Sequence, residues 1–194
     1  RLGALAAEAG RGGGRALLVG DATVHPGIAD RYPPLPAAPE ELARLRELYP
    51  EASVLQGRKA HADALLQGLD ETVEVLHFAG HAVSAPEVPG GSHLVLAPGP
   101  DHGGGQAPED GLLFAHALAR QGFQGPELVV LTACSSVAPR PGSLGGFQGI
   151  AVPFLERGTS AVLGTLWEVE DEGAASIASA FHAGWVDGLP AREA

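Results

Sequence analysis

The alternation of short apolar runs with segments of helical periodicity is the feature that most restricts how this chain can fold. Runs rich in leucine, valine and alanine predict strands at 15–21, 51–57, 73–81, 127–134 and 160–167. Segments with helical spacing and helix-end signals lie at 39–50, 61–69, 147–158 and 170–188. Strands that alternate with helices predict a mainly parallel sheet that helices cover on both faces. The expected fold class is therefore α/β.

The interval 82–110 interrupts this rhythm. It contains a predicted strand at 92–98, followed by a connection rich in glycine and proline, and no segment has the pattern of a crossover helix. We therefore expect a β-hairpin insertion there. After the insertion, residues 112–122 have the pattern of a helix that ends at Gly122.

Length and composition are those of one globular domain. The chain has 194 residues, of which 45% are hydrophobic, enough to bury a substantial core. The glycine-rich residues 1–14 precede the first strand and lack the strand-then-helix context of a phosphate loop, so they are predicted to be a linker or arm. Residues 15–194 are expected to form the domain. Because the chain has no methionine and ends like the start of a helix, we expect it to belong to a longer multidomain protein.

Charge and cysteine content exclude several classes of function. The formal net charge of −11 repels a phosphate backbone and no basic stripe occurs, so we expect no direct binding of nucleic acid. The single cysteine cannot form an internal disulfide, and no apolar stretch reaches the length of about 20 residues that a membrane span needs. No secretory signal is recognisable either. The expected location is the cytoplasm, without membrane attachment.

Polar and reactive residues gather at one expected edge of the sheet. In open α/β sheets, ligands bind outside the carboxyl ends of the strands, so the residues that follow the predicted strands are candidates for a site. These residues are Asp21, Gly80, His81, Cys134, Ser135, Ser136, Trp167, Glu168 and Asp171. A thiol, an imidazole and several carboxylates are thus expected at one edge, although they lie far apart in the sequence.

Cys134 and His81 have the chemistry of a nucleophile and its acid–base partner. Cysteine attacks as a thiolate, and the end of a strand exposes it near backbone N–H groups that stabilise negative charge. His81 can accept the thiol proton or protonate the leaving amine. The N–H groups of Gly80 and Cys134 are candidates for an oxyanion hole.

Position alone leaves other roles open for these residues. Free cysteine is among the most buried residue types, so on position alone Cys134 is equally well a small core residue. His77 lies inside an apolar run and is expected in the core. A metal site of His77, His81 and Cys134 is disfavoured, because the H-x-x-x-H spacing normally works on one face of a helix.

Five segments together resemble the CHAT domain, a caspase-like cysteine peptidase domain that is often attached to tetratricopeptide repeats and is related to separase. In chain order they read VEVLHFAGHAV, SHLVLAP, DGLLFAHALA, LVVLTACSSV and GTSAVLGTLWEVEDEGAASIASAFHAGWVDG. The resemblance covers roughly residues 15–194 and implies a caspase-type α/β/α sandwich. It also implies that the second histidine of HFAGH, His81, is the catalytic one and that Cys134 is the nucleophile.

The resemblance further implies where specificity lies. In the family, the side chain before the scissile bond enters a pocket lined by residues after the first and fifth strands, which here are Asp21 and the segment WEVED. Carboxylates in such a pocket favour arginine or lysine through charge-assisted hydrogen bonds. Asp171 is the leading candidate for this acid and Glu168 and Asp21 are alternates. A role in the first turn of the following helix is equally well supported for Asp171.

The expected function is that of a cysteine endopeptidase that cleaves a protein partner after Arg or Lys, in bacterial signalling or defence. Flanking domains or partner proteins, such as helical repeats, are expected to regulate it. Two alternatives stay open: a catalytically silent interaction or signalling module that keeps the fold, and an acyl transferase or hydrolase that uses the same dyad. We expect no cofactor, and no metal, since no loop has a recognisable spacing of oxygen ligands.

Overall fold

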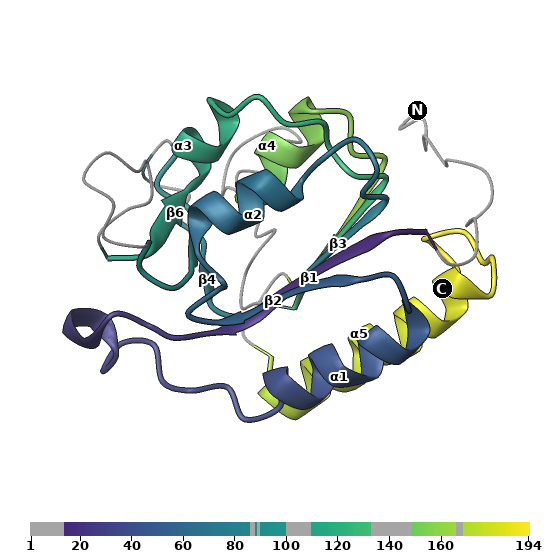
Figure 1. Ribbon diagram of the computed structural model, residues 1–194, viewed down its shortest axis with the longest axis horizontal. Coiled ribbons are helices and arrows are strands. Elements are labelled where there is room, and N and C mark those ends of the chain that lie inside the picture. The colour runs from purple at the N-terminus through teal and green to yellow at the C-terminus, as the bar shows by residue number, and fades with distance from the viewer. Residues whose placement is uncertain (1–13, 86–87, 89, 100–109, 133–148, 166–168) are drawn as a thin grey trace.

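The computed structural model describes residues 14–85, 88, 90–99, 110–132, 149–165 and 169–194 of the chain. At its centre lies a sheet of five parallel strands in the order β2-β1-β3-β7-β8 (Figure 1). The strands are β1 Ala16–Ala22, β2 Ser53–Gly57, β3 Val75–Ala79, β7 Leu128–Thr132 and β8 Ala161–Gly164. Each coincides with a predicted strand to within a few residues, and the sheet confirms the α/β class.

Helices cover both faces of this sheet (Figure 1). One face carries α1 Ala38–Leu48 and α5 Asp171–Val186, and the other carries α2 Ala62–Gly68, α3 Ala115–Ala119 and α4 Ala151–Glu156. Because both faces are covered, neighbouring residues of one strand enter different cores. In β1, Leu17 and Val19 belong to the core under α2, α3 and α4, whereas Leu18 belongs to the core under α1 and α5. The result is the caspase-like α/β/α sandwich that the resemblance implies.

The first long helix, α1, follows the signals in its sequence. Pro39 lies in the first turn, where a missing N–H leaves no hydrogen bond broken. Glu40 and Glu41 also lie in the first turn, where negative charge stabilises the helix end. Leu42 and Leu45 are buried against the sheet. The amphipathic pattern therefore orients this helix as well as forming it.

A second, smaller sheet contains three antiparallel strands in the order β4-β5-β6. They are β4 Ala82–Val83, β5 His93–Val95 and β6 Leu112–Phe114. The pairing of β4 with β5 is the predicted hairpin insertion. The predicted helix at 112–122 is wrong in its first part, because residues 112–114 pair with β5 and the helix α3 starts only at Ala115. A single 3-10 turn, Pro26–Ile28, follows β1.

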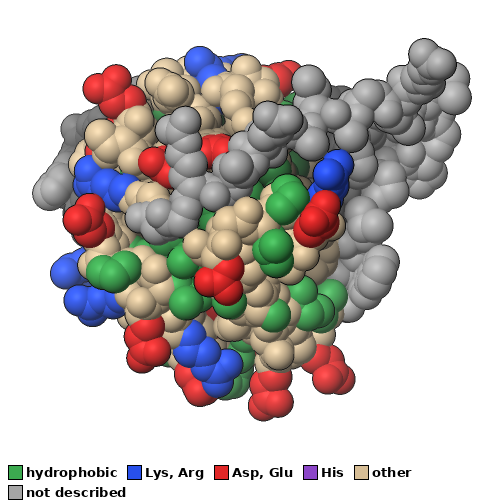
Figure 2. Space-filling view, turned by 90° about the vertical axis from the view of Figure 1, so that its right-hand side faces the viewer, with side chains coloured by type: hydrophobic (Ala, Val, Ile, Leu, Met, Phe, Trp, Pro, Cys, Tyr) green, Lys and Arg blue, Asp and Glu red, His purple; other side chains and the backbone are tan. Residues whose placement is uncertain are grey.

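On the face seen in Figure 2, acidic and basic side chains are interspersed with small apolar groups. Among the described residues, no helix is long and apolar enough to cross a membrane. Residues 1–13 lie outside the described residues, so the linker or arm at 1–14 and the larger multidomain protein stay predictions.

Candidate active site

His81 lies two residues beyond the end of β3, at the carboxyl edge of the central sheet. It is half-buried, and its Nε2 lies 2.7 Å from the backbone oxygen of Pro33. A carbonyl oxygen only accepts, so Nε2 carries the hydrogen and donates it. In the neutral ring, Nδ1 is then the acceptor. The contact therefore selects the tautomer that can take a proton at Nδ1.

A buried tyrosine supports the same imidazole. The ring centroids of Tyr32 and His81 are 5.5 Å apart. The Tyr32 hydroxyl lies 3.2 Å from Nε2 of His93, whose Nδ1 lies 2.9 Å from the oxygen of Gly91. Since Nδ1 of His93 donates to that carbonyl, Nε2 accepts from Tyr32. Tyr32 is thus fixed at its hydroxyl while its ring contacts His81.

Gly80, the residue between β3 and His81, is confined by the core. A Cβ atom at this position would lie 2.6 Å from Cζ of Phe78, whose side chain is fully buried. Packing therefore requires glycine here, independently of the oxyanion role predicted from the sequence.

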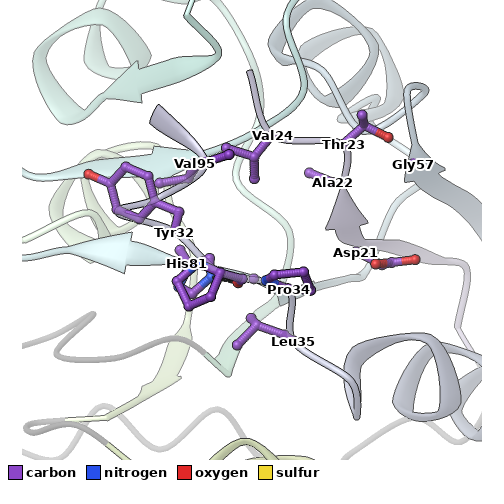
Figure 3. Close-up of a pocket in the computed structure, with 13 residues that line it drawn as sticks. Asp21, Ala22, Thr23, Val24, Tyr32, Pro34, Leu35, Gly57, His81 and Val95 are labelled. Atoms are coloured by element: carbon purple, nitrogen blue, oxygen red, sulfur yellow. Dashed lines mark hydrogen bonds between the residues drawn. The ribbon is translucent and has the colours of Figure 1, made fainter. Parts of the chain in front are cut away.

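A pocket of about 320 Å³ opens beside His81 (Figure 3). Tyr32 and His81 lie at one end of it and Asp21 lies at the other. Most of the remaining wall is apolar and includes Ala22, Val24, Pro34, Leu35 and Val95. Such a pocket suits a side chain with an apolar stem and a polar end.

Asp21 reaches this pocket through an irregularity in β1. The register with β2 shifts between Gly20 and Ala22, which marks Asp21 as a bulge, and its φ of 46° lies in the left-handed region. Its Oδ2 accepts a hydrogen bond of 3.0 Å from Nε2 of Gln56. Bulges of this kind re-aim a side chain at a strand end, which is where the sequence predicts this acid.

Asp171, the first residue of α5, has a specific backbone partner. Its Oδ2 accepts a hydrogen bond of 2.7 Å from the N–H of Ala37, the residue before α1. Asp171 also lines a small cavity together with Gly80, His81 and Thr132. The structure therefore brings Asp171 near His81, with one of its oxygens bound to the chain itself.

The remaining candidates from the sequence lie outside the described residues; they are Cys134, Ser135, Ser136, Trp167 and Glu168. The strand that leads to Cys134 is described as far as Thr132. Ala79 of β3 pairs with Thr132 of β7 as the last pair of the two strands. His81 and Cys134 each follow this pair by two positions in the sequence.

Four buried polar groups, three of them joined by hydrogen bonds, form a chain of contacts between the sheet and its helices. His77 Nε2 lies 3.1 Å from Glu41 Oε1, and His77 Nδ1 lies 3.1 Å from His182 Nε2. His182 Nδ1 lies 2.9 Å from the Tyr49 hydroxyl. Glu41 Oε1 accepts no hydrogen bond among the described residues, and the Thr132 hydroxyl also lies 3.5 Å from His77 Nε2. Because a carboxylate only accepts, the nitrogen that faces it carries the hydrogen, so Tyr49 donates to His182 and His182 donates to His77. His77 is in the core as predicted, whereas no partner for His182 was predicted.

Burial shifts the pKa values of two members of this chain, His182 and Tyr49. It lowers the pKa of His182 to about 2, with a further contribution from the neighbouring His77. It raises the pKa of Tyr49 well above its ordinary value, so Tyr49 stays a hydrogen-bond donor. In His77, Nε2 faces Glu41 and Nδ1 faces His182. Among the described residues, no group of three or more His, Cys, Asp or Glu side chains could hold a metal ion.

Comparison with known protein families gives a match over nearly the whole chain. The family model of the CHAT domain matches residues 4–194, which confirms the resemblance found in the sequence. The matched span includes both the histidine block and the cysteine block. A search of curated proteins found no match.

Proposed function

The chain belongs to the CHAT domain family, and on this basis we propose that it is a cysteine endopeptidase with Cys134 as nucleophile and His81 as general acid and base. Family membership makes it a caspase-like, peptidase-related domain. The proposal adds that the peptidase chemistry is intact and that the substrate is a protein. Flanking regulatory domains or partner proteins, such as helical repeats, are proposed to control it.

The register of β3 and β7 is the observation that carries this proposal. Their last paired residues are Ala79 and Thr132, and His81 and Cys134 follow them by the same two positions. Neighbouring strands of a sheet lie about 4.8 Å apart. This register supports a dyad across the two strand ends. The hydrogen bond from His81 Nε2 to Pro33 supports it further, since it leaves Nδ1 as the proton acceptor.

In the proposed reaction, Nδ1 of His81 accepts the thiol proton and the sulfur of Cys134 attacks the carbonyl carbon of the scissile bond. The C=O electron pair moves onto oxygen, and the N–H groups of Gly80 and Cys134 are the proposed donors to it. When the tetrahedral intermediate collapses, the C–N bond breaks and His81 protonates the leaving amine. Water then attacks the thioester with His81 as base, which releases the acid and restores the thiol.

We propose that the substrate carries arginine or lysine before the scissile bond. The pocket beside His81 offers an apolar wall for the stem of such a side chain and the Asp21 carboxylate for its charge. Glu168 remains a proposed contributor. Asp21 lines this pocket, whereas Asp171 lines a separate, smaller cavity, so Asp21 becomes the first candidate among the described acids.

Labelling with a peptidyl electrophile tests the dyad. We expect one label per chain, on Cys134, with none in Cys134→Ala and a reduced rate in His81→Ala. A panel of fluorogenic peptides that differ only in the residue before the bond then tests specificity. Preference for aspartate at that position would contradict the basic specificity while leaving the peptidase intact.

A silent interaction module predicts a different outcome. In that case a folded wild-type chain shows neither labelling of Cys134 nor cleavage of any peptide in the panel. Labelling together with transfer of the acyl group to an amine rather than to water would instead favour an acyl transferase.

A further inference from the structure

We propose that Asp171 is a positioning residue for His81, which it holds through the proline-rich segment 33–37. The inference deepens the proposed function and rests on it in one respect, since only an acid–base role for His81 makes its orientation matter to catalysis. The contacts themselves join α5 to the loop before α1, and that loop to the end of β3.

The first link is between Asp171 and Ala37. The carboxylate oxygen Oδ2 accepts the backbone N–H of Ala37 at 2.7 Å, the length expected for a hydrogen bond to an ionised acceptor. The two residues are 134 positions apart in the sequence. The bond therefore fixes the end of the loop to the start of α5.

The second link is the stiffness of the loop. Three of its five residues, Pro33, Pro34 and Pro36, are prolines, whose rings fix φ. The residue before each proline is restricted as well, which limits Pro33 and Leu35. A segment with so few free dihedral angles transmits a restraint at Ala37 to the carbonyl of Pro33, which accepts from His81 at 2.7 Å.

The opposite end of the loop is also held. Tyr32 is buried, and its hydroxyl donates to His93 of β5. Pro33 follows directly and so lies between two anchors, Tyr32 on the small sheet and Asp171 on α5. Loss of the Asp171 anchor leaves the Pro33 carbonyl free to move away from Nε2, and the imidazole then loses the contact that selects its tautomer.

This role differs from that of a specificity acid in a way that substitution can separate. An asparagine at position 171 keeps an oxygen that accepts from Ala37 but has no negative charge. It should preserve positioning, whereas it would remove the attraction of a specificity acid for arginine. Alanine removes both functions.

The experiment compares Asp171→Ala, Asp171→Asn and the wild-type chain, with Glu172→Ala as control for loss of negative charge in the first turn of α5. Glu172 is an exposed neighbour in that turn. The first readout is the tautomer of His81, from ¹⁵N chemical shifts of histidine-labelled protein, assigned with His81→Gln. The second is kcat and KM on one arginine peptide and its citrulline counterpart.

We expect Asp171→Ala to lose the Nε2–H preference of His81 and to lower kcat roughly 10- to 100-fold with little change in KM, since small misplacements of a catalytic group cost this much. Asp171→Asn and Glu172→Ala should keep both the tautomer and most of kcat. The ratio of arginine to citrulline cleavage should be the same in Asp171→Asn as in the wild-type chain.

Two results overturn the inference. One is an unchanged His81 tautomer in Asp171→Ala. The other is a loss of peptidase activity in Asp171→Asn that is confined to the arginine peptide. That result would make Asp171 a specificity acid. The comparison can be made even where Asp171→Ala does not fold. A wild-type chain without peptidase activity whose His81 tautomer still depends on Asp171 refutes the proposed function and leaves the positioning contact established.

Discussion

A methyl group at position 80 has no room in this fold, although the chain there leads directly to the candidate catalytic histidine. The Cβ of an alanine would lie 2.6 Å from the buried ring of Phe78. We expect Gly80→Ala to lower the free energy of unfolding by about 1–3 kcal/mol, because overpacking forces buried side chains from their rotamers. Urea denaturation measures the change at its midpoint.

Gly122 provides the matched control for this substitution. No atom lies within 4 Å of a Cβ built at Gly122, so Gly122→Ala should keep the stability of the wild-type chain or raise it slightly. Equal denaturation midpoints for Gly80→Ala and Gly122→Ala would show that the Phe78 ring moves aside without lowering the free energy of unfolding.

Single residues of the site differ in how far the sequence reveals them. The placement of His81 and Asp21 at one edge of the sheet is predictable, because each stands at the end of an apolar run with the pattern of a strand and strand ends meet at one edge. Pro33 and Tyr32 lie in a proline-rich loop without periodicity, and their contacts reach residues 48 and 61 positions away. Such contacts depend on how the loop folds back over the sheet, which the local pattern does not encode.

At the scale of elements, the buried chain from Tyr49 to Glu41 joins three parts of the sandwich. Glu41 lies on α1, His77 on β3 and His182 on α5, and Tyr49 directly follows α1. All four side chains are buried, and each ring nitrogen of both histidines has a neighbour within hydrogen-bond distance. The chain thus links the two helices on this face to the central strand, with His182 held neutral by its burial.

The low pKa of His182 makes the stability of this packing depend on pH. In the unfolded chain His182 takes up a proton near its ordinary value of 6.5, whereas in the folded chain it does so only at about 2. The unfolded state therefore binds more protons between these values, and stability falls as the pH falls below about 6.5. The expected slope from this one group is about 1.4 kcal/mol per pH unit, measured by urea denaturation at a series of pH values.

Two variants separate this titration from simple loss of packing. His182→Gln removes the titrating group, and its amide can still accept from Tyr49 and donate to His77. The slope of stability against pH should therefore decrease by the contribution of up to one proton, about 1.4 kcal/mol per pH unit. Tyr49→Phe leaves His182 in place but deprives Nδ1 of its donor, which should cost about 1–3 kcal/mol at neutral pH. An acid slope in His182→Gln equal to that of the wild-type chain would refute the assignment.

Elements with their own periodicity are predicted well from the sequence, and elements defined by a partner are not. The strands of the central sheet and the helices α1 and α5 carry apolar patterns that continue through their length. The three residues of β6 instead form a strand because they pair with β5, and their sequence, LLF before AHALA, continues a helical pattern equally well. The same holds for the pairing of His77 with His182 across 105 positions, which no local signal encodes.

At the scale of the whole molecule, charge is the property that bears most directly on the proposed substrate. The chain has 23 acidic and 12 basic residues, a net charge of −11. On the face in Figure 2, acidic and basic groups are mixed. The field of the net negative charge adds a long-range attraction for cations to the local charge of the Asp21 carboxylate. Such a field attracts a cationic peptide before it reaches the pocket.

This field predicts a dependence of proteolysis on salt. The Debye length falls from about 30 Å at 0.01 M to about 3 Å at 1 M, so long-range attraction is lost over this range while contacts inside the pocket are screened much less. We expect kcat/KM for an arginine peptide with blocked termini to fall several-fold from low to high salt, mainly through the association rate. The citrulline counterpart, which has the same shape without the charge, should change little. Parallel salt curves for the two peptides would show that the net charge does not steer the substrate, and that recognition of arginine, where it is observed, arises within the pocket alone.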